Sequence, residues 1–165
     1  MNHAGLSGSN SFSRALLLAP VVFVCHFLEE SPGFVAWFNS HVGRGITSDL
    51  FWGVNVTALL ITTAVVGAEW VSRSALSAGV AISWLGFLMP ANAVFHVAGS
   101  LVDGRYVPGL LTAVLLYLPF YAWLFARALK ERRGTAAVFA AAAAAASLPM
   151  LVHGYLILFR GSRLF

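Results

Sequence analysis

Five long apolar segments, separated by short polar connections, set the pattern of this sequence. A helix that crosses the hydrocarbon core of a bilayer needs roughly 20 mostly apolar residues, and each segment approaches or exceeds that length. The third segment is long enough to tilt or bend, and Pro90 predicts where, because proline removes a backbone hydrogen bond to Gly86. We therefore predict an all-α integral membrane bundle of about five transmembrane helices, over residues 14–30, 50–68, 75–101, 109–128 and 135–159.

The connection between the first two segments has an apolar face of its own. Phe34, Val35, Trp37 and Phe38 fall on one side of a helix drawn through residues 31–49. Apolar side chains on one face of a short helix are typical of helices that lie in the plane of the membrane interface. We predict such an interfacial segment between helices one and two, across the mouth of any site at that end.

The two ends of the chain are predicted to lie outside the bundle. Residues 1–13 are expected to form a flexible tail, residues 160–165 a C-terminal tail, and residues 14–159 a single transmembrane domain. The start of the chain has some features of a secretory signal peptide. However, its apolar run ends in a histidine and two glutamates rather than in a small-residue cleavage site, which favours a retained first helix.

Composition agrees with this pattern. Hydrophobic residues make up 59% of the chain and charged residues only 10%, whereas soluble domains carry roughly 25% charged residues. A water-soluble fold of this composition would expose large apolar patches, so the lipid bilayer is the expected surrounding. The net charge of +4 is thinly spread, which argues against nucleic acid as a partner, and the single Cys25 excludes an intrachain disulfide.

The basic residues predict an orientation. Cytoplasmic loops of membrane proteins carry an excess of Lys and Arg. Six basic residues fall on the N-terminal side of the five segments and four on the opposite side, which favours a cytoplasmic N-terminus and an external C-terminus. The two sets are Arg14, Arg73, Arg127, Lys130, Arg132 and Arg133, and then Arg44, Arg105, Arg160 and Arg163.

Ionisable side chains interrupt the C-terminal end of the first segment, in His26-Phe27-Leu28-Glu29-Glu30. Around a helix, Glu29 lies about 60° from His26 on one side and Glu30 about 40° on the other. All three therefore project from one face within a turn, where an imidazole and a carboxylate can share a metal ion or exchange a proton. This spacing leaves open which glutamate points inwards.

The third and fifth segments carry further polar groups at the same membrane level. Helices one, three and five cross the membrane in the same direction, so their C-terminal halves lie at one face. Because the polar residues gather in these halves, we expect the other half of the bundle to be apolar. Trp52 and Asn55, at the start of the second helix, are expected at the same level. The residues predicted to converge there are His26, Glu29, Glu30, Asn92, His96 and His153.

Two interpretations of this convergence compete. Ionisable groups inside a bilayer are costly unless they are paired or hydrated, so they usually mark a functional site. Alternatively, Glu29 and Glu30 snorkel into the head groups, and a single histidine such as His153 satisfies a neighbouring carbonyl. Two adjacent glutamates are an inefficient way to hold helices together, which favours a shared site.

The same residues resemble the HXXEE family of membrane proteins. The resemblance is carried, in the family's order, by His26-x-x-Glu29-Glu30, by Asn92-x-x-x-His96, and by Tyr106-x-Pro108-Gly109 followed by Thr112, and it covers roughly residues 20–130. It implies a multi-helix integral membrane protein, commonly prokaryotic, and hence the bacterial inner membrane. It implies no particular reaction, and His153 falls outside its motifs.

The leading functional hypothesis is a membrane-embedded enzyme that binds a divalent metal: zinc, iron or manganese. Two histidines and one carboxylate leave open positions for water or substrate. The substrate is expected to be amphiphilic, a lipid or isoprenoid, because the site opens beside acyl chains. The candidate metal ligands are His26, Glu29, Glu30, His96 and His153. The candidate catalytic groups are Glu29 and Glu30, as general base or as support for a histidine, and Asn92, which would orient a ligand or polarise a substrate oxygen.

Three alternatives remain open on sequence grounds. A protonated carboxylic acid in apolar surroundings could start a metal-free isomerisation or cyclisation of a lipid. Intramembrane histidines and glutamates also mark ion pathways, as in a small proton-coupled transporter, although an apolar opposite half argues against a continuous polar track. A structural or assembly role is the third alternative, and self-association into a homo-oligomer stays open.

Overall fold

The computed structural model describes residues 11–161, which form helices and short connections and include no strand. Five helical spans in this range are long and apolar enough to cross a membrane, so the predicted all-α bundle is confirmed. The spans are α1 (Ser11–Leu16) with α2 (Ala19–Glu30), α4 (Ser48–Ser72), α5 (Ala75–Gly86) with η1 (Phe87–Ala91) and α6 (Asn92–Asp103), α7 (Leu110–Thr112) with η2 (Ala113–Tyr117) and α8 (Leu118–Lys130), and α9 (Ala136–Arg160).

The predicted tails lie mostly outside the described residues, which exclude 1–10 and 162–165. Within the described range, the first helix begins at Ser11, three residues earlier than the predicted first segment, and the last helix ends at Arg160.

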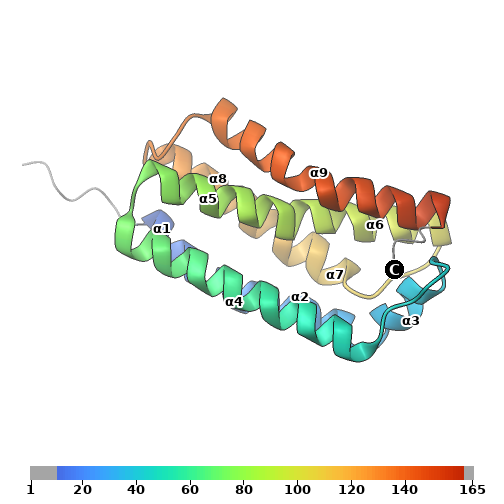
Figure 1. Ribbon diagram of the computed structural model, residues 1–165. Helices are drawn as coiled ribbons and strands as arrows, with labels where there is room; N and C mark the ends of the chain where they lie inside the picture. Colours follow the sequence, from blue (N-terminus) through green and yellow to red (C-terminus); the bar gives the residue numbers. More distant parts are fainter. Residues whose placement is uncertain (1–10, 162–165) are drawn as a thin grey trace, which may run out of the picture.

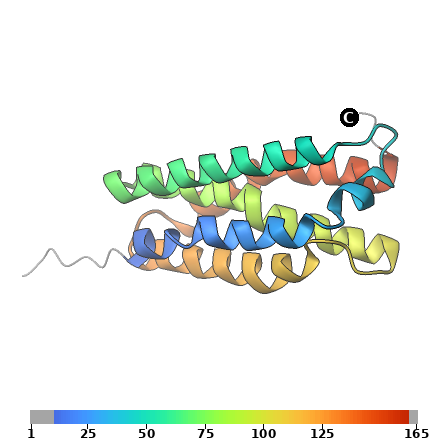
Figure 2. The same cartoon turned by 90° about the horizontal axis from the view of Figure 1, so that it is seen from below.

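The spans lie side by side and alternate in direction (Figures 1 and 2). One end of the bundle, here called the α3 end, holds the ends of α2 and α6, the starts of α4 and α7, and the short helix α3 (Phe34–Asn39). The opposite end, here called the α1 end, holds the start of α1, the α4–α5 turn and the α8–α9 connection. Figure 1 shows α3 at its end of the bundle, as expected for a segment that covers the mouth of a site there.

Prolines explain the irregular turns inside three spans. Pro20 stands in the first turn of α2, just after the break that separates α1 from α2. Pro90 lies inside the π-helical turn η1, and Pro119 follows η2 by two residues. A proline inside a helix removes one hydrogen bond and its ring crowds the carbonyl four residues earlier, and a widened turn relieves that crowding.

The interior of the bundle is mostly apolar between the two ends, where Phe23, Phe27, Leu85 and Met89 belong to one buried cluster. The spans share this interior unequally. In an apolar stretch of 18 residues within each helix, only 17% of α4 and 11% of α9 is buried inside the protein. Apolar residues that are exposed over most of a helix require an apolar solvent, so α4 and α9 present the broadest surfaces to lipid.

Glu69 corrects the prediction that the half of the bundle away from the histidines is apolar. Near the end of α4, its side chain is fully buried at the α1 end. It accepts hydrogen bonds from Ser13 (2.9 Å) and from Ser77, and the Arg133 guanidinium lies 3.6 Å away. Buried carboxylates are tolerated when paired and hydrogen-bonded in this way. The network ties α1, α4, α5 and the α8–α9 connection together.

Candidate metal centre

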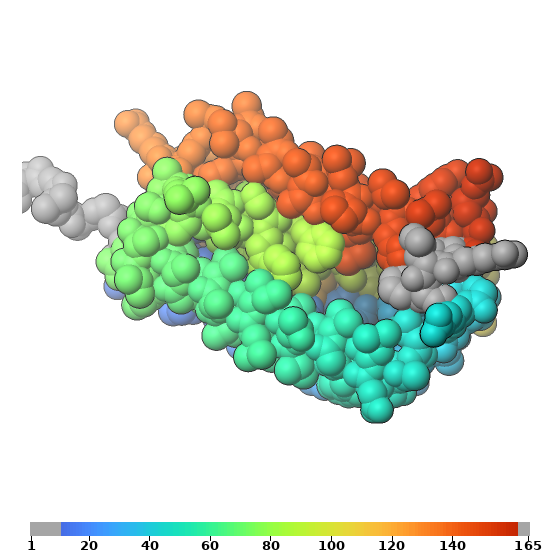
Figure 3. Space-filling model, in the orientation of Figure 1, coloured from blue at the N-terminus to red at the C-terminus, as the bar shows by residue number. Residues whose placement is uncertain are grey.

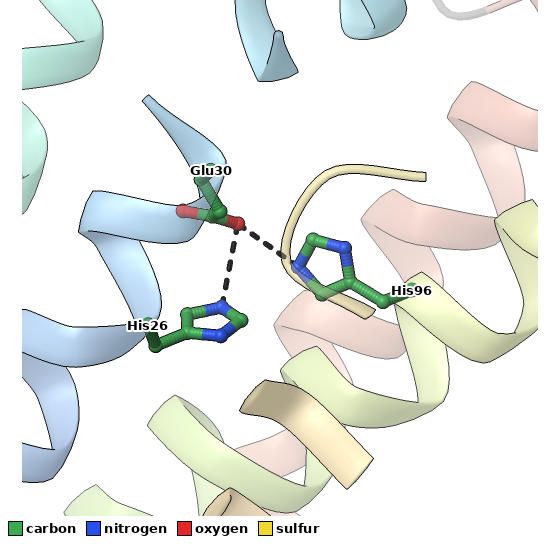
Figure 4. Close-up of side chains that lie close together, drawn as sticks. All are labelled: His26, Glu30 and His96. Atoms are coloured by element: carbon green, nitrogen blue, oxygen red, sulfur yellow. Dashed lines mark ion pairs between the residues drawn. The ribbon is translucent and has the colours of Figure 1, made fainter. Parts of the chain in front are cut away.

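Two helices bring an acid and two histidines together at the α3 end (Figure 4). His26 and Glu30 are four residues apart on α2 and share one face, and His96 projects towards them from α6. Oε1 of Glu30 lies 3.4 Å from Nε2 of His26 and 2.9 Å from Nε2 of His96. One donor atom from each residue lies within 4.8 Å of the others. The predicted convergence of these three residues is therefore present in the fold.

The cluster is shielded from water. His26 is 1% exposed, His96 0% and Glu30 4%. The ring of Tyr117 from η2 lies 4.1 Å from the His26 ring, centroid to centroid, and Phe34 from α3 lies 5.9 Å from the His96 ring. Burial of this kind excludes the snorkelling interpretation for Glu30, because its carboxylate is enclosed by the protein and does not extend from its surface.

Thr112 sets the protonation pattern of His26. Nδ1 of His26 lies 2.8 Å from Oγ1 of Thr112, and that hydroxyl donates its only proton to the Glu29 carboxylate. A hydrogen bond to a carboxylate is stronger than one to a neutral imidazole, so the hydroxyl serves His26 as an acceptor. Nδ1 of His26 therefore carries the proton, and in the neutral ring Nε2 presents a lone pair to Glu30.

A lone pair facing a carboxylate oxygen calls for a cation between them. Nε2 of His26 and both ring nitrogens of His96 are buried and have no hydrogen-bond partner among the described residues. Zinc bound at about 2.1 Å by tetrahedral ligands would set the donor atoms about 3.4 Å apart. The Glu30 contacts of 3.4 and 2.9 Å are close to that spacing. The donor set thus fits a divalent metal held by two imidazoles and one carboxylate.

Glu29 supports the cluster from outside. Its carboxylate accepts hydrogen bonds from the Thr112 side chain, from the backbone N–H groups of Leu111 (3.1 Å) and Thr112 (2.7 Å), and from the Tyr106 hydroxyl. Burial and the hydrogen bond to Glu29 raise the pKa of Tyr106 to about 12, which keeps this phenol a proton donor. The hydrogen-bonded chain from Glu29 through Thr112 to His26 is of the kind that orients metal-binding histidines.

Gly109 makes room for the cluster. Its φ of +92° lies in the left-handed region that favours glycine. A Cβ atom at this position would lie 2.7 Å from Cε1 of His96 and 2.9 Å from Cγ of Glu30. The backbone between α6 and α7 can therefore pass directly against two of the three candidate ligands.

A cavity of about 290 Å³ adjoins the cluster, with His26 and Glu30 in its wall. Asn92 and His153 also line it, together with Asn55 from α4. Oδ1 of Asn92 is buried without a hydrogen-bond partner in the described part of the chain. Most of the remaining wall is apolar. The cavity lies between α4 and α9, where Figure 3 shows the surface of the molecule hollowed.

The cover formed by α3 is fastened to the end of α6. The indole N–H of Trp37 donates to Asp103 at 2.8 Å, and Nε2 of His41 lies 3.0 Å from the same carboxylate. His41, expected in the interfacial segment, therefore holds the cover in place rather than joining the metal cluster. Trp37 and Phe38 are buried beneath α3 as part of a small aromatic core.

The fold separates the six predicted residues into three groups. His26, Glu30 and His96 form the cluster, Glu29 stands behind it, and Asn92 and His153 line the neighbouring cavity without joining the set of donor atoms. The role of Thr112 as the link between His26 and Glu29 was not predicted, although its place after the Tyr106-x-Pro108-Gly109 motif was a signal. Tyr117 was also missed, and nothing in its local sequence distinguishes it from packing.

Comparison with known proteins adds a family. A model described as a protein of unknown function with an HXXEE motif matches residues 17–124. The uncharacterized protein YrkK of Bacillus subtilis (strain 168) is 31% identical over 108 residues, which cover 60% of this chain and 68% of that relative. No solved structure matches the chain.

Proposed function

The chain belongs to the HXXEE family, and we propose that it is a membrane-embedded enzyme whose His26, Glu30 and His96 hold a divalent metal. The family description carries no reaction, so the proposal stands on the site. We further propose an amphiphilic substrate, because the cavity that adjoins the cluster is lined by α4 and α9, which present apolar surfaces along most of their length.

One observation carries the proposal: Nε2 of His26, buried and without a hydrogen-bond partner among the described residues, lies 3.4 Å from the Glu30 carboxylate. The Thr112–Glu29 pair favours the proton of His26 on the opposite nitrogen, and the close approach of the two acceptors is favourable only with a metal ion or a further proton between them. Two histidines and a carboxylate leave coordination positions free for water or substrate, as catalytic metal sites do. Bound there, a divalent metal would polarise a substrate oxygen or lower the pKa of a water molecule.

The chain's own residues have separate roles in this proposal. Glu29 and Thr112 orient the His26 ring, and the aromatic cover of α3 excludes bulk water. Asn92 offers an amide in the cavity wall to a substrate oxygen or hydroxyl. Glu30 is the carboxylate ligand, and Glu29 is a positioning residue rather than a ligand.

We place the protein in a bacterial inner membrane with the α1 end in the cytoplasm. The relative named above is bacterial. The six basic residues assigned to the N-terminal side, including Arg127, Lys130 and Arg133, belong to the α1 end of the bundle, against three described ones at the α3 end. An excess of basic residues marks the cytoplasmic side, which puts the metal centre towards the external face.

The deciding experiment is metal content by elemental mass spectrometry. Untagged protein is purified in detergent from cells grown with added zinc, iron and manganese, alongside a His26→Ala, His96→Ala double variant. His153→Ala is the matched control, because His153 lines the same cavity but lies outside the donor set. We expect close to one metal per chain in the wild type and in the control, and loss of it in the double variant.

Wild-type protein without metal, after a control for loss during purification, would refute the metal site. A second candidate, a metal-free acid–base catalyst of lipid isomerisation or cyclisation, would then take its place. The buried Glu30 carboxylate between two imidazoles favours this candidate over the others, because acid–base chemistry needs such groups close together. Proton-coupled transport lacks comparable support, because an apolar core separates the cluster from the Glu69 network.

A further inference from the structure

The cavity beside the cluster opens sideways. On α4, Leu50 and Val54 line it and are also 48% and 59% exposed. Across the opening, Met150 and His153 of α9 line it and are half-buried. Both helices present apolar surfaces along most of their length. A molecule that reaches the cluster through this opening therefore comes from the hydrocarbon region of the bilayer and not from water.

The cavity wall lacks the groups that bind anionic head groups. Among the described residues that line it there is no Lys, Arg, Ser, Thr or Tyr, and its polar members are His26, Glu30, Asn55, Asn92 and His153. Phosphates are normally held by Arg, Lys, hydroxyls or helix N-termini. Apart from a metal at the cluster, the wall offers a phosphate only neutral amides and imidazoles, and no Lys or Arg to balance its charge. An uncharged head group is the one that this wall can accept.

Asn92 specifies what that head group must offer. Its Oδ1 atom is buried and has no hydrogen-bond donor among the described residues, a state that is costly unless a ligand supplies one. A hydroxyl or an amide N–H can donate to it, whereas a carboxylate or phosphate dianion cannot. The unpaired oxygen of Asn92 and the absence of Lys and Arg from the described wall are separate observations. Both favour an uncharged head group that can donate a hydrogen bond.

The volume limits how much of the molecule is enclosed. At about 290 Å³ the cavity lies at the small end of the range of ligand cavities, about 300–1,000 Å³. That is enough for a small head and the first part of one chain, with the rest lying in the bilayer between α4 and α9.

We propose that the cavity binds an uncharged single-chain lipid with a hydroxyl or amide head, which enters between α4 and α9 and places its head group between Asn92 and the cluster. This inference rests on the proposed function for the chemistry that follows binding. The binding itself is carried by the cavity, its wall and Asn92.

The test uses photoactivatable lipids on the full chain in phosphatidylcholine nanodiscs. The two probes are a C16 alcohol and the matching C16 acid, each with a mid-chain diazirine, and the labelled peptides are identified by mass spectrometry. We expect the alcohol to label α4 and α9 residues of the cavity at least about fivefold more than the acid, the effect of one hydrogen bond.

Three variants locate the binding. Val54→Trp fills the opening and should lower labelling by the alcohol about fivefold or more. Leu60→Trp, at an exposed position of the same helix outside the cavity wall, should leave it unchanged. Asn92→Leu removes the acceptor and should reduce the preference for the alcohol over the acid by about fivefold. Each sample is checked for a single species by size exclusion, and its metal content is measured.

Equal labelling by alcohol and acid in the wild type, or labelling unaffected by both Val54→Trp and Asn92→Leu, would overturn the inference. If such samples still hold metal, the proposed metal centre stands and only the lipid assignment fails. If the alcohol is captured selectively by a protein without metal, the lipid site stands and the metalloenzyme proposal fails.

Discussion

Replacement of Thr112 by valine tests the assignment of the cluster without touching any of its three donor residues. Valine has nearly the same shape as threonine, so the packing of α7 should persist while one hydroxyl is lost. That hydroxyl accepts from Nδ1 of His26 at 2.8 Å and donates to Glu29. Glu29 keeps its backbone donors and Tyr106, so the direct loss falls on His26.

The size of the expected loss in zinc affinity follows from the burial of His26. His26 is 1% exposed, so its N–H group cannot find water in place of the lost acceptor, and an unsatisfied buried donor costs about 1–3 kcal/mol. Metal sites that lose such a supporting partner weaken about 10–100-fold, which agrees with that range at 1.4 kcal/mol for each factor of ten. We therefore expect zinc affinity to fall about 30-fold in Thr112→Val.

Competition for zinc against a fluorescent chelator, on detergent-purified protein, measures this change. Thr112→Ser retains the hydroxyl and should bind nearly as tightly as the wild type. Thr63→Val is the matched control, because Thr63 is exposed and its hydroxyl donates to the Leu59 carbonyl of its own helix. An affinity of Thr112→Val within about twofold of the wild type, or an equal loss in Thr112→Ser, would show that the Thr112–His26 contact does not tune the site.

Two further substitutions test features on either side of the cluster. Gly109→Ala should lower metal occupancy and the melting temperature together, because its Cβ would lie 2.7 Å from His96 and φ is +92°; a variant with wild-type occupancy would contradict the close approach. Partial burial raises the pKa of the Glu131 carboxyl, but hydrogen bonds from Ser11 and Phe12 outweigh it and hold the pKa below its ordinary value. The stability that this carboxylate adds is therefore present above about pH 4.5 and is lost as pH falls through the lowered pKa. Glu131→Gln should melt about 3 °C lower at neutral pH, for a loss of about 1 kcal/mol, and the gap should close on acidification; a gap that persists at low pH would refute the linkage.

The sequence predicted the parts of the site that depend on helix geometry. His26 and Glu30 share a face because they are four residues apart, and His96 meets them because alternate spans return to the same membrane level. The choice between Glu29 and Glu30 could not be predicted, since the two lie at similar angles to His26. It is decided by Thr112 and Tyr106, whose contacts with Glu29 bridge about 80 residues of sequence.

The rotation of a helix about its own axis accounts for the other differences. His153 was placed at the correct level, yet α9 turns it towards the cavity and not into the cluster. Glu69 was overlooked because a glutamate near a helix end is usually solvated. Its burial depends on Ser13 and Ser77, which belong to two other helices. Neither feature follows from periodicity within one segment.

Because of the widened turn η1, the direction of His96 depends on the number of residues in this segment as much as on which residues they are. A π-helical turn accommodates one more residue than an α-helical one, so the face of α6 that carries His96 is offset from the face of α5 by the equivalent of one residue, about 100°. Deleting a single residue between Gly86 and Asn92 would leave every ligand in the sequence while turning His96 away from Glu30. Relatives that keep His26, Glu30 and His96 in this arrangement should therefore tolerate substitutions in this stretch far better than insertions or deletions, and its length should be the same throughout the family.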